Sequence, residues 1–458
     1  MDMRTVNIKK YWVYAFLLFF LTVPLLSAPH ISWSGLFLAL FIFISYKFKL
    51  PKFPIALFII SFVLRAAVVL CIKTPLQSDF STMYNASQGV LVNDFSFLKD
   101  DYFKYWPYQI GFVVYQSILL RICNKILFLK LVNCVLSSLT VVLVYLSAKE
   151  LAGKKAAAVV SLVYCLLPFP LTLTTVLTNQ IPATFLIYLG IYIIISSKLR
   201  LNVYIRYTVF SVLAVISNVL RPEGIVPVLS VALFLVLTVK KDNIKKKSIN
   251  LLIVILVYFV LFKAVSLLFK VTGMSPSGLV NNAPYWKFVL GFNQETGGAY
   301  SRSDAVVLGD NEAAYALVKE RIMVPVNQLI ELFKNKINAF WNSSTVLWSF
   351  GYAYSGLYLF GKTFEIVDFC ALLEKINVFV MNMAYIFMIF GVFSYNRKKE
   401  CNYNFLPFMN MVFVTFGVFL LIEVQQRYAY NIQPAVLILA ALGVAKSAEW
   451  IKAKKQVI

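Results

Sequence analysis

The feature that most constrains the fold of this chain is a series of long apolar runs that contain almost no charged residue. A helix needs about 20 mostly apolar residues to cross the hydrocarbon core of a bilayer, and runs of about this length recur throughout the chain. Hydrophobic residues make up 60% of the 458 residues and charged residues only 14%, unlike a soluble globular domain. The sequence therefore predicts an all-α, polytopic membrane protein.

We expect about 12 transmembrane helices, with boundaries uncertain by several residues. They are placed at 11–28, 31–46, 54–72, 130–148, 156–171, 182–197, 207–221, 224–239, 249–269, 372–394, 405–422 and 430–447. The first run follows three basic residues, so a cleaved signal peptide is an alternative for it. An uncleaved span is favoured because further spans follow immediately.

The basic residues predict the orientation of the chain in the membrane. They gather in the short loops that lie on one side when the N-terminus is placed in the cytoplasm, as the positive-inside rule requires. This accounts for the net charge of +23 without a nucleic-acid partner. We expect a multi-pass protein of the plasma membrane, surrounded by membrane lipids.

Residues 107–127 are apolar enough to be counted as another span. Counting them would invert every later loop and place the basic clusters outside. We therefore predict an amphipathic helix on the outer membrane surface. The chain becomes one membrane domain, 1–458, with external loops at 73–129 and 271–371 that carry short surface helices.

The sequence gives little support for a metal site or for catalysis by histidine. The six cysteines contain no CxxC pair, and the only histidine is His30. Clustered ligands are what zinc and iron–sulfur sites need, so no metal ligand and no cofactor is predicted, although a divalent metal stays open.

The candidate catalytic residue is Asp79, in the loop that follows the third span. A carboxylate this close to the bilayer is either a solvated loop residue or a general base that takes a proton from an acceptor hydroxyl. If Ser78 caps a helix that begins near Phe80, the helix dipole would keep Asp79 ionised.

Cations on the predicted outer side are candidates for binding a phosphate. Arg221 and Arg427 end spans on the side that the positive-inside rule leaves poor in basic residues, so an anionic partner is the better explanation for them. Lys104 follows Asp101 and Tyr102 in an aromatic surface stretch and can also hold a phosphate. Arg65 and Lys263 lie inside predicted spans, where snorkelling or pairing explains them equally well, and we leave them out of the site.

Five segments occur in an order that resembles the polytopic GT-C glycosyltransferases of family 39 type, which include protein O-mannosyltransferases and the bacterial aminoarabinose transferase that acts on lipid A. Each segment alone is weak, but the ordered set spans residues 75 to 434. The segments are Pro75–Phe80, Tyr105–Gly111, Pro168–Pro182, Asn218–Gly224, and Val424–Tyr428 through Pro434.

The resemblance implies a GT-C fold and an inverting glycosyltransferase at the outer face of the membrane. The donor would be a polyprenyl-phosphate sugar and the acceptor a glycan, lipid or protein. Asp79 would be the general base. Lys104, Arg221 and Arg427 would bind the donor phosphate, and the substrate would meet Asp101, Tyr102, Asn179, Glu223 and Tyr428.

One position departs from the family pattern, and two other functions stay open. Many relatives carry an acid where this chain has Asn179, and an amide is neither a base nor a strong metal ligand. Residues 285–304 are polar and aromatic, and we expect them to shape the acceptor side.

Two alternative functions are considered. A flippase for lipid-linked oligosaccharides would show midplane sites and internal repeats. An outward-facing polysaccharide polymerase or ligase would not require the Ser78-Asp79-Phe80 motif.

Overall fold

The structure is a computed structural model, and it describes residues 3–26, 53–72, 74–342, 357–359, 362–364, 367–396 and 402–455. Within these residues, seven helices are long and apolar enough to cross a membrane. They are α3 (Phe53–Cys71), α7 (Ile126–Leu166), α10 (Val203–Leu220), α12 (Ile244–Val271), α17 (Val367–Asn396), α18 (Leu406–Leu421) and α19 (Gln433–Lys455). A multi-pass membrane protein is thereby confirmed, whereas the expected count of about 12 spans is not shown.

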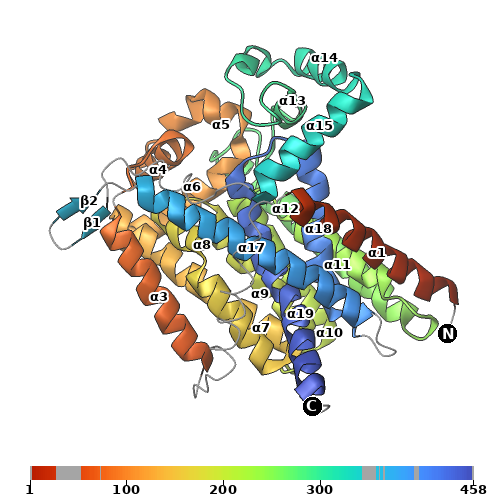
Figure 1. The fold of residues 1–458 in the computed structure, drawn as a ribbon. Helices are drawn as coiled ribbons and strands as arrows, with labels where there is room; N and C mark the ends of the chain where they lie inside the picture. The colour runs from red at the N-terminus through yellow and green to blue at the C-terminus, as the bar shows by residue number, and fades with distance from the viewer. Residues whose placement is uncertain are drawn as a thin grey trace.

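The remaining helices complete the bundle and build a cap at one end of it (Figure 1). Two shorter apolar helices, α9 (Gln180–Ile195) and α11 (Ile225–Leu237), lie in the bundle with α1 (Met3–Leu26). The other helices are α4 (Ser78–Leu91), α5 (Asp101–Tyr105), α6 (Ile110–Ile122), α8 (Pro168–Thr172), α13 (Trp286–Gly291), α14 (Asn311–Ile322) and α15 (Val326–Ile337).

Short irregular turns and one small hairpin connect these helices. Two three-residue strands, β1 (Leu357–Leu359) and β2 (Lys362–Phe364), pair antiparallel, so the described chain is helical except for this hairpin. A π-helical turn follows α15 at Asn338–Asn342. The 3₁₀ turns are η2 (Ser96–Lys99), η3 (Pro107–Gln109), η4 (Leu173–Thr175), η5 (Lys241–Asn243), η6 (Ser303–Val307), η8 (Tyr403–Phe405) and η9 (Gln426–Ile432).

Several predicted spans coincide with single helices, and two are joined. The predicted spans 54–72 and 207–221 match α3 and α10 within a few residues. Spans 130–148 and 156–171 correspond to two helical segments of α7 that meet at a kink at Gly153, where φ is 82°, and the second span continues into α8. The kink lies between basic residues, where the two predicted spans are separated. The predicted span 31–46 lies outside the described residues.

Residues 107–127 form the short turn η3 and the helix α6 in place of a span. With 13 residues, α6 is about 20 Å long at 1.5 Å per residue, which is less than the thickness of a hydrocarbon core of about 30 Å. Its buried face packs against α4 and α10. The prediction that this segment is not a span agrees with its length, and its place on the membrane surface stays a prediction.

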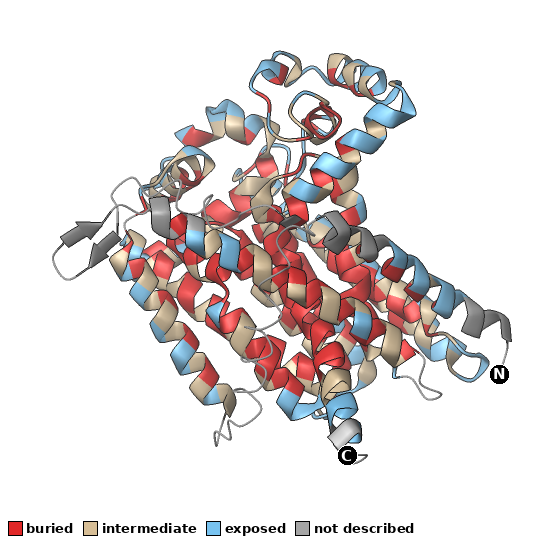
Figure 2. Cartoon of the chain, viewed as in Figure 1, coloured by how far each residue is buried: buried red, intermediate tan, exposed pale blue. Residues whose placement is uncertain are grey.

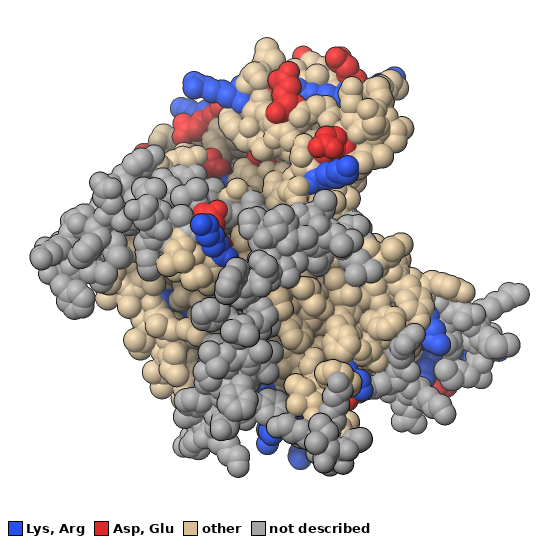
Figure 3. Space-filling model, in the orientation of Figure 1, with Lys and Arg blue, Asp and Glu red and all other residues tan. Residues whose placement is uncertain are grey.

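Burial separates the helices of the bundle into central and peripheral ones. From Ala435 to Val444, nearly every residue of α19 is buried, and red fills the centre of the bundle in Figure 2. By contrast, α12 exposes a broad apolar surface that includes Leu256 and Val260. Figure 3 shows few charged side chains across the middle of the molecule and more at its two ends. This is the charge distribution expected of helices surrounded by lipid.

Two glycines allow α17 and α19 to pack backbone against backbone. A Cβ atom built on Gly443 would lie 2.1 Å from the carbonyl oxygen of Phe387, and one on Gly391 would lie 2.2 Å from the amide nitrogen of Gly443. No carbon atom can approach that closely. Small residues at helix crossings in membranes serve this purpose, because association there depends on close van der Waals packing.

We expect Gly443→Ala to destabilise the protein by about 1–3 kcal/mol, the usual cost of overpacking. The matched control is Gly417→Ala in α18, where an added Cβ meets nothing within 4 Å. Alanine at position 417 should be neutral or slightly stabilising, because glycine is a poor helix former. Thermal unfolding in detergent measures both. Equal melting temperatures for the two variants would contradict this account of the α17–α19 contact.

The buried arginine of α3 has only neutral hydrogen-bond partners among the described residues, and its Nη2 has none. Arg65 is fully buried and donates to the hydroxyls of Ser61 and Ser137 and to the carbonyl of Cys165, near the end of α7. A cation near a helix C-terminus also interacts favourably with the helix dipole. Arg65 therefore has a structural explanation, and Lys263, on α12, is exposed.

Candidate functional site

The turn between α10 and α11 fixes the position of Arg221. A Cβ on Gly224 would lie 2.5 Å from the Cβ of Asn218, so the chain can close this turn only with glycine. The amide of Gly224 donates to the side chain of Asn218 at 3.0 Å. The turn presents Arg221 and Glu223 together, and Nε of Arg221 donates to Oε1 of Glu223 at 2.6 Å. Their side chains are 11% and 20% exposed, so this ion pair is largely buried.

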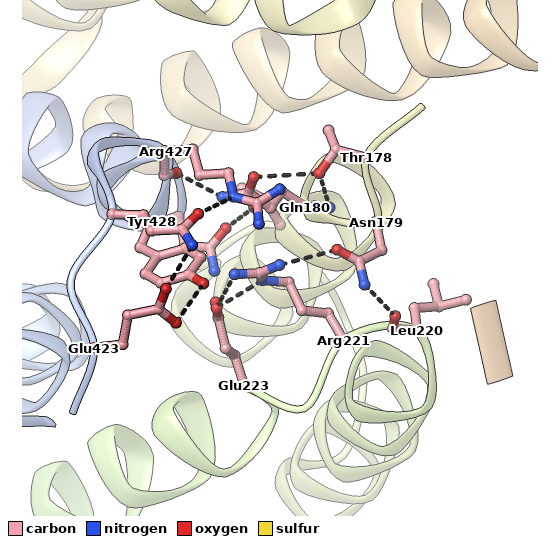
Figure 4. Close-up of polar contacts among 12 residues, drawn as sticks. Thr178, Asn179, Gln180, Leu220, Arg221, Glu223, Glu423, Arg427 and Tyr428 are labelled. Carbon is pink, nitrogen blue, oxygen red and sulfur yellow. Dashed lines mark hydrogen bonds and ion pairs between the residues drawn. The ribbon is translucent and has the colours of Figure 1, made fainter. Parts of the chain in front are cut away.

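Asn179, directly before α9, holds the other side of this guanidinium. Its Oδ1 accepts from Nη1 of Arg221 at 2.9 Å, and its Nδ2 donates to the carbonyl of Leu220 at 3.1 Å (Figure 4). Nδ2 also donates to the side chain of Gln109. An amide fits this place because it both accepts and donates, whereas a carboxylate only accepts.

We expect Asn179→Asp to lower stability, because Asn179 is only 4% exposed and the substitution removes both donated hydrogen bonds. An unsatisfied buried acceptor costs about 1–3 kcal/mol, and Arg221 is already paired with Glu223. The control is Asn202→Asp, because Asn202 accepts a hydrogen bond from the amide of Tyr204 at the start of α10. A carboxylate keeps that role. Unchanged unfolding of Asn179→Asp would mean that its donor atoms are unimportant.

The segment after α18 supplies a second group of charges. Glu423 is fully buried, forms an ion pair with Lys287 of α13, and accepts from Gln425 at 2.7 Å. The backbones of these two residues are also hydrogen bonded, since the amide of Glu423 donates to the carbonyl of Lys287 at 2.7 Å. Arg427 then donates from Nε to the side chain of Gln425 at 2.8 Å.

A hydrogen bond to α9 joins this segment to the first group. Gln180 donates from Nε2 to the carbonyl of Arg427 at 2.6 Å, and Thr178 donates to Oε1 of Gln180 (Figure 4). Arg427 is therefore fixed through its carbonyl and through its side chain. Residues separated by about 250 positions in the sequence thus become neighbours.

The ring of Tyr428 lies at the centre of these charges. The guanidinium groups of Arg221 and Arg427 are 5.3 and 5.5 Å from the ring centroid, and Nζ of Lys287 is 6.0 Å from it. Attraction of a cation to an aromatic face extends to about 6 Å. We call Tyr428 and the five charged residues around it the cation cluster; the five are Arg221, Glu223, Lys287, Glu423 and Arg427.

The cation cluster contains one more cation than carboxylates. The carboxylate of Glu423 stays ionised, because Lys287 overcomes the effect of burial and lowers the pKa of Glu423. Burial alone would lower the pKa of Lys287, but Tyr428 and Glu423 raise it above its ordinary range. The cluster is therefore positively charged at neutral pH, and planar guanidinium groups suit phosphate oxygens.

Asp79 lies in the first turn of α4, next to a residue that contacts the cation cluster. The next residue, Phe80, places its ring 5.4 Å from the guanidinium of Arg427. The helix begins at Ser78 and follows Gln77, which provides no side-chain cap. The condition that Ser78 caps a helix starting near Phe80 is therefore not met. Asp79 nevertheless occupies the first turn, where the helix dipole favours a negative charge.

Two tyrosines interact electrostatically with both Asp79 and the cations. Burial raises the pKa of Tyr102 well above its usual range, Asp79 raises it further, and Arg427 acts in the opposite direction. Burial also raises the pKa of Tyr108 to about 12, against the effects of Lys287 and Arg221. The hydroxyl of Tyr102 is buried and has no hydrogen-bond partner among the described residues. A bound ligand would give it one.

Two predicted residues lie away from the cation cluster. Lys104 and Asp101 form an ion pair with each other on α5, with Nζ and Oδ1 3.0 Å apart and side chains that are 56% and 76% exposed. Such an exposed pair contributes little to stability. The structure brings Arg221, Arg427, Asn179, Glu223 and Tyr428 together, but it does not add Lys104 and Asp101 to them.

Three residues of the site were not predicted from the sequence. Lys287 lies in the 285–304 segment that we expected to shape the acceptor side, Glu423 is 136 positions away from it, and Tyr108 lies at the start of the predicted surface helix. No fixed spacing links these positions. A carboxylate directly after a span, at Glu423, was the one available signal.

Within the described residues, no group of three or more His, Cys, Asp or Glu side chains could hold a metal ion. Metal independence stays a prediction.

The structure aligns with solved archaeal oligosaccharyltransferases at low identity. No protein-family model matches it, and no curated protein matches its sequence. The oligosaccharyltransferase AglB from Archaeoglobus fulgidus, solved with an inhibitory peptide and a dolichol-phosphate, aligns over 89% of this chain and 52% of its own, with 13% identity and a TM-score of 0.48. The apo form of the Archaeoglobus fulgidus enzyme aligns over 88% of this chain and 51% of its own, with 15% identity and a TM-score of 0.48.

The chain thus spans about half the length of these oligosaccharyltransferases. At this identity and TM-score, the alignments identify neither a family nor a reaction nor a donor. The resemblance to family 39 glycosyltransferases stays a prediction.

Proposed function

We propose that this chain is an inverting membrane glycosyltransferase that moves a sugar from a polyprenyl-phosphate donor to a hydroxyl of a glycan, lipid or protein acceptor. What supports the proposal is that Asp79 and the cations Arg427, Arg221 and Lys287 act electrostatically on the same pair of tyrosines, Tyr102 and Tyr108. A carboxylate next to an anion-binding group of cations is what single displacement at an anomeric carbon needs.

In the proposed reaction, the acceptor oxygen attacks the anomeric carbon and its proton passes to Asp79. The bond between that carbon and the phosphate oxygen breaks, and the polyprenyl phosphate leaves with both bonding electrons. The cation cluster stabilises the negative charge that develops on the leaving phosphate. Single in-line attack inverts the configuration of the sugar.

The remaining predicted residues take supporting roles in this reaction. Asn179 and Glu223 orient Arg221, Tyr428 provides the aromatic face for the cations, and the hydroxyl of Tyr102 donates to the donor. Lys104 and Asp101 lie farther out on α5, where they would meet the substrate as it enters. The reaction requires no cofactor in this form.

The experiment that tests the function uses the purified full-length chain in liposomes with radiolabelled polyprenyl-phosphate sugars. We expect label to move to an extracted glycan, lipid or protein fraction, together with release of free polyprenyl phosphate. Movement of intact donor between leaflets without release would support a flippase and contradict the proposal. Extension of a lipid-linked glycan en bloc would support a polymerase or ligase.

The proposed orientation places the cation cluster on the extracytoplasmic side of the plasma membrane and the N-terminus in the cytoplasm. In a cysteine-free background, we expect Glu312→Cys, on the exposed surface of α14, to react with an impermeant maleimide in intact cells. Lys241→Cys, at the other end of the bundle, should react only after permeabilisation. Asp79→Cys and Arg221→Cys must both behave like Glu312→Cys. Labelling of those two from opposite sides would exclude a shared site.

A further inference from the structure

The end of the bundle opposite the cap contains a buried lysine that has no counter-charge among the described residues. Lys9 of α1 is only 6% exposed, and its Nζ lies 5.2 Å from the ring centroid of Tyr403. Within the part of the chain that the structure describes, no carboxylate lies at ion-pair distance from it. A buried cation that has only an aromatic face as partner is incompletely compensated.

The other buried lysines of this chain differ from Lys9. Lys130 donates to the carbonyl of Thr74 at 3.0 Å. Lys336 donates to the carbonyls of Gly291 and Leu420 at 2.8 and 2.7 Å, near the C-terminal ends of two helices. Both therefore have oxygen partners supplied by the protein, so burial of lysine in this fold normally comes with an acceptor. Lys9 is the exception among these three.

Two further lysines, Lys240 and Lys247, lie in the connection between α11 and α12 and at the start of α12. Both interact electrostatically with Lys9, and α11, which leads into this connection, packs against α1. Lys247 is half-buried, donates to the hydroxyl of Thr238 at 2.9 Å, and lies 4.6 Å from the ring centroid of Phe234. We call Lys9, Lys240 and Lys247 the lysine triad. Three converging cations and two aromatic faces form a site that an anion would stabilise.

The surroundings of the lysine triad indicate which anion this is. Ile8, Tyr11 and Ile244 expose apolar side chains at the same end of α1 and α12, with exposed fractions of 60%, 67% and 56%. The lysines thus lie where apolar helix surface gives way to charged loops, and Figure 3 shows basic side chains at this end of the molecule. A free phosphate ion would use only the charges, whereas a phospholipid would use both features.

We infer that the lysine triad binds the phosphate headgroup of an anionic phospholipid whose acyl chains lie along the exposed apolar surface of α1 and α12. The headgroup phosphate supplies the counter-charge that Lys9 lacks. The lipid would link α1 to the α11–α12 turn. This inference uses no residue of the cation cluster and does not depend on the proposed reaction.

The test measures lipid binding to the purified full-length chain by native mass spectrometry. The probes are phosphatidylglycerol and phosphatidylcholine with identical acyl chains, and inorganic phosphate serves as competitor. The test variant combines Lys9→Gln, Lys240→Gln and Lys247→Gln. The control variant combines Lys154→Gln, Lys198→Gln and Arg200→Gln, which remove three exposed cations from the same end of the bundle.

We expect the test variant to bind phosphatidylglycerol about 100-fold more weakly, because each lysine near a lipid phosphate contributes roughly fivefold. Binding of phosphatidylcholine should be unchanged, and the control variant should lose little. Lys9→Arg should retain binding. If the triple variant does not fold, Lys240→Gln alone, which changes an exposed side chain, should weaken binding about fivefold.

Two results would overturn the inference. Equal losses in the test and control variants would show that the lipid responds only to overall charge. Displacement of phosphatidylglycerol by millimolar phosphate would show that the triad holds a free anion.

Discussion

Asp79→Asn is expected to slow sugar transfer by about 10²–10⁴-fold, the usual contribution of a positioned general base. The amide has nearly the same shape as the carboxylate but cannot accept the proton of the attacking hydroxyl. Donor binding should survive, because we propose that Arg221, Lys287 and Arg427 hold the donor phosphate. The measurement is single-turnover transfer from a labelled polyprenyl-phosphate sugar, together with donor binding under the same conditions.

Asp79 is suited to this test because its side chain makes few contacts with the rest of the protein. It is partly exposed, and the hydrogen bond shown for its carboxylate is a long one from Ser78, 3.4 Å. The substitution should therefore leave thermal unfolding unchanged. Asp100→Asn is the matched control, since Asp100 is exposed on the same external loop and its side chain caps no helix. Undiminished transfer by Asp79→Asn would remove Asp79 from the reaction.

The part of the fold that sequence could predict is the part that depends on local hydrophobicity. Apolar runs identified α3 and α10 within a few residues, since a span is specified by its own composition. Basic loops decided against a span at 107–127, where the structure has the short helix α6. The same reasoning separated spans 130–148 and 156–171 at a group of basic residues, and α7 is indeed divided there into two helical segments by a kink at Gly153.

The residues of the site fall into two groups, those at the ends of spans and those in the external loops. Arg221 and Arg427 could be found because each contradicts the charge bias of its own loop. Lys287 could not, because nothing distinguishes it from an ordinary loop lysine until Glu423 is folded against it. Lys104 was predicted to belong to the site but is not part of the cation cluster. It follows Asp101 by three positions in a helix, a spacing that favours a local ion pair.

The second large effect is expected from Arg427→Gln, which should lower the rate of transfer by about 10²–10³-fold, as loss of one preorganised donor to a developing charge does. Arg427 is the cation that connects the two halves of the site, since its guanidinium lies over Phe80 on the Asp79 side and over Tyr428 on the other. Glutamine keeps length and polarity but removes the charge that the leaving phosphate needs. Single-turnover rates should therefore fall more than donor affinity.

Arg427→Lys separates charge from geometry. Lysine retains the positive charge but loses the planar group that stacks on both rings and binds two phosphate oxygens at once, so its rate should lie between those of wild type and glutamine. Arg302→Gln, an exposed arginine in the 271–371 loop, controls for loss of a surface cation. If lysine and glutamine were equally impaired and both unfolded at lower temperature, Arg427 would be a structural residue that positions η9. If both kept normal transfer, the leaving group would have to be stabilised elsewhere.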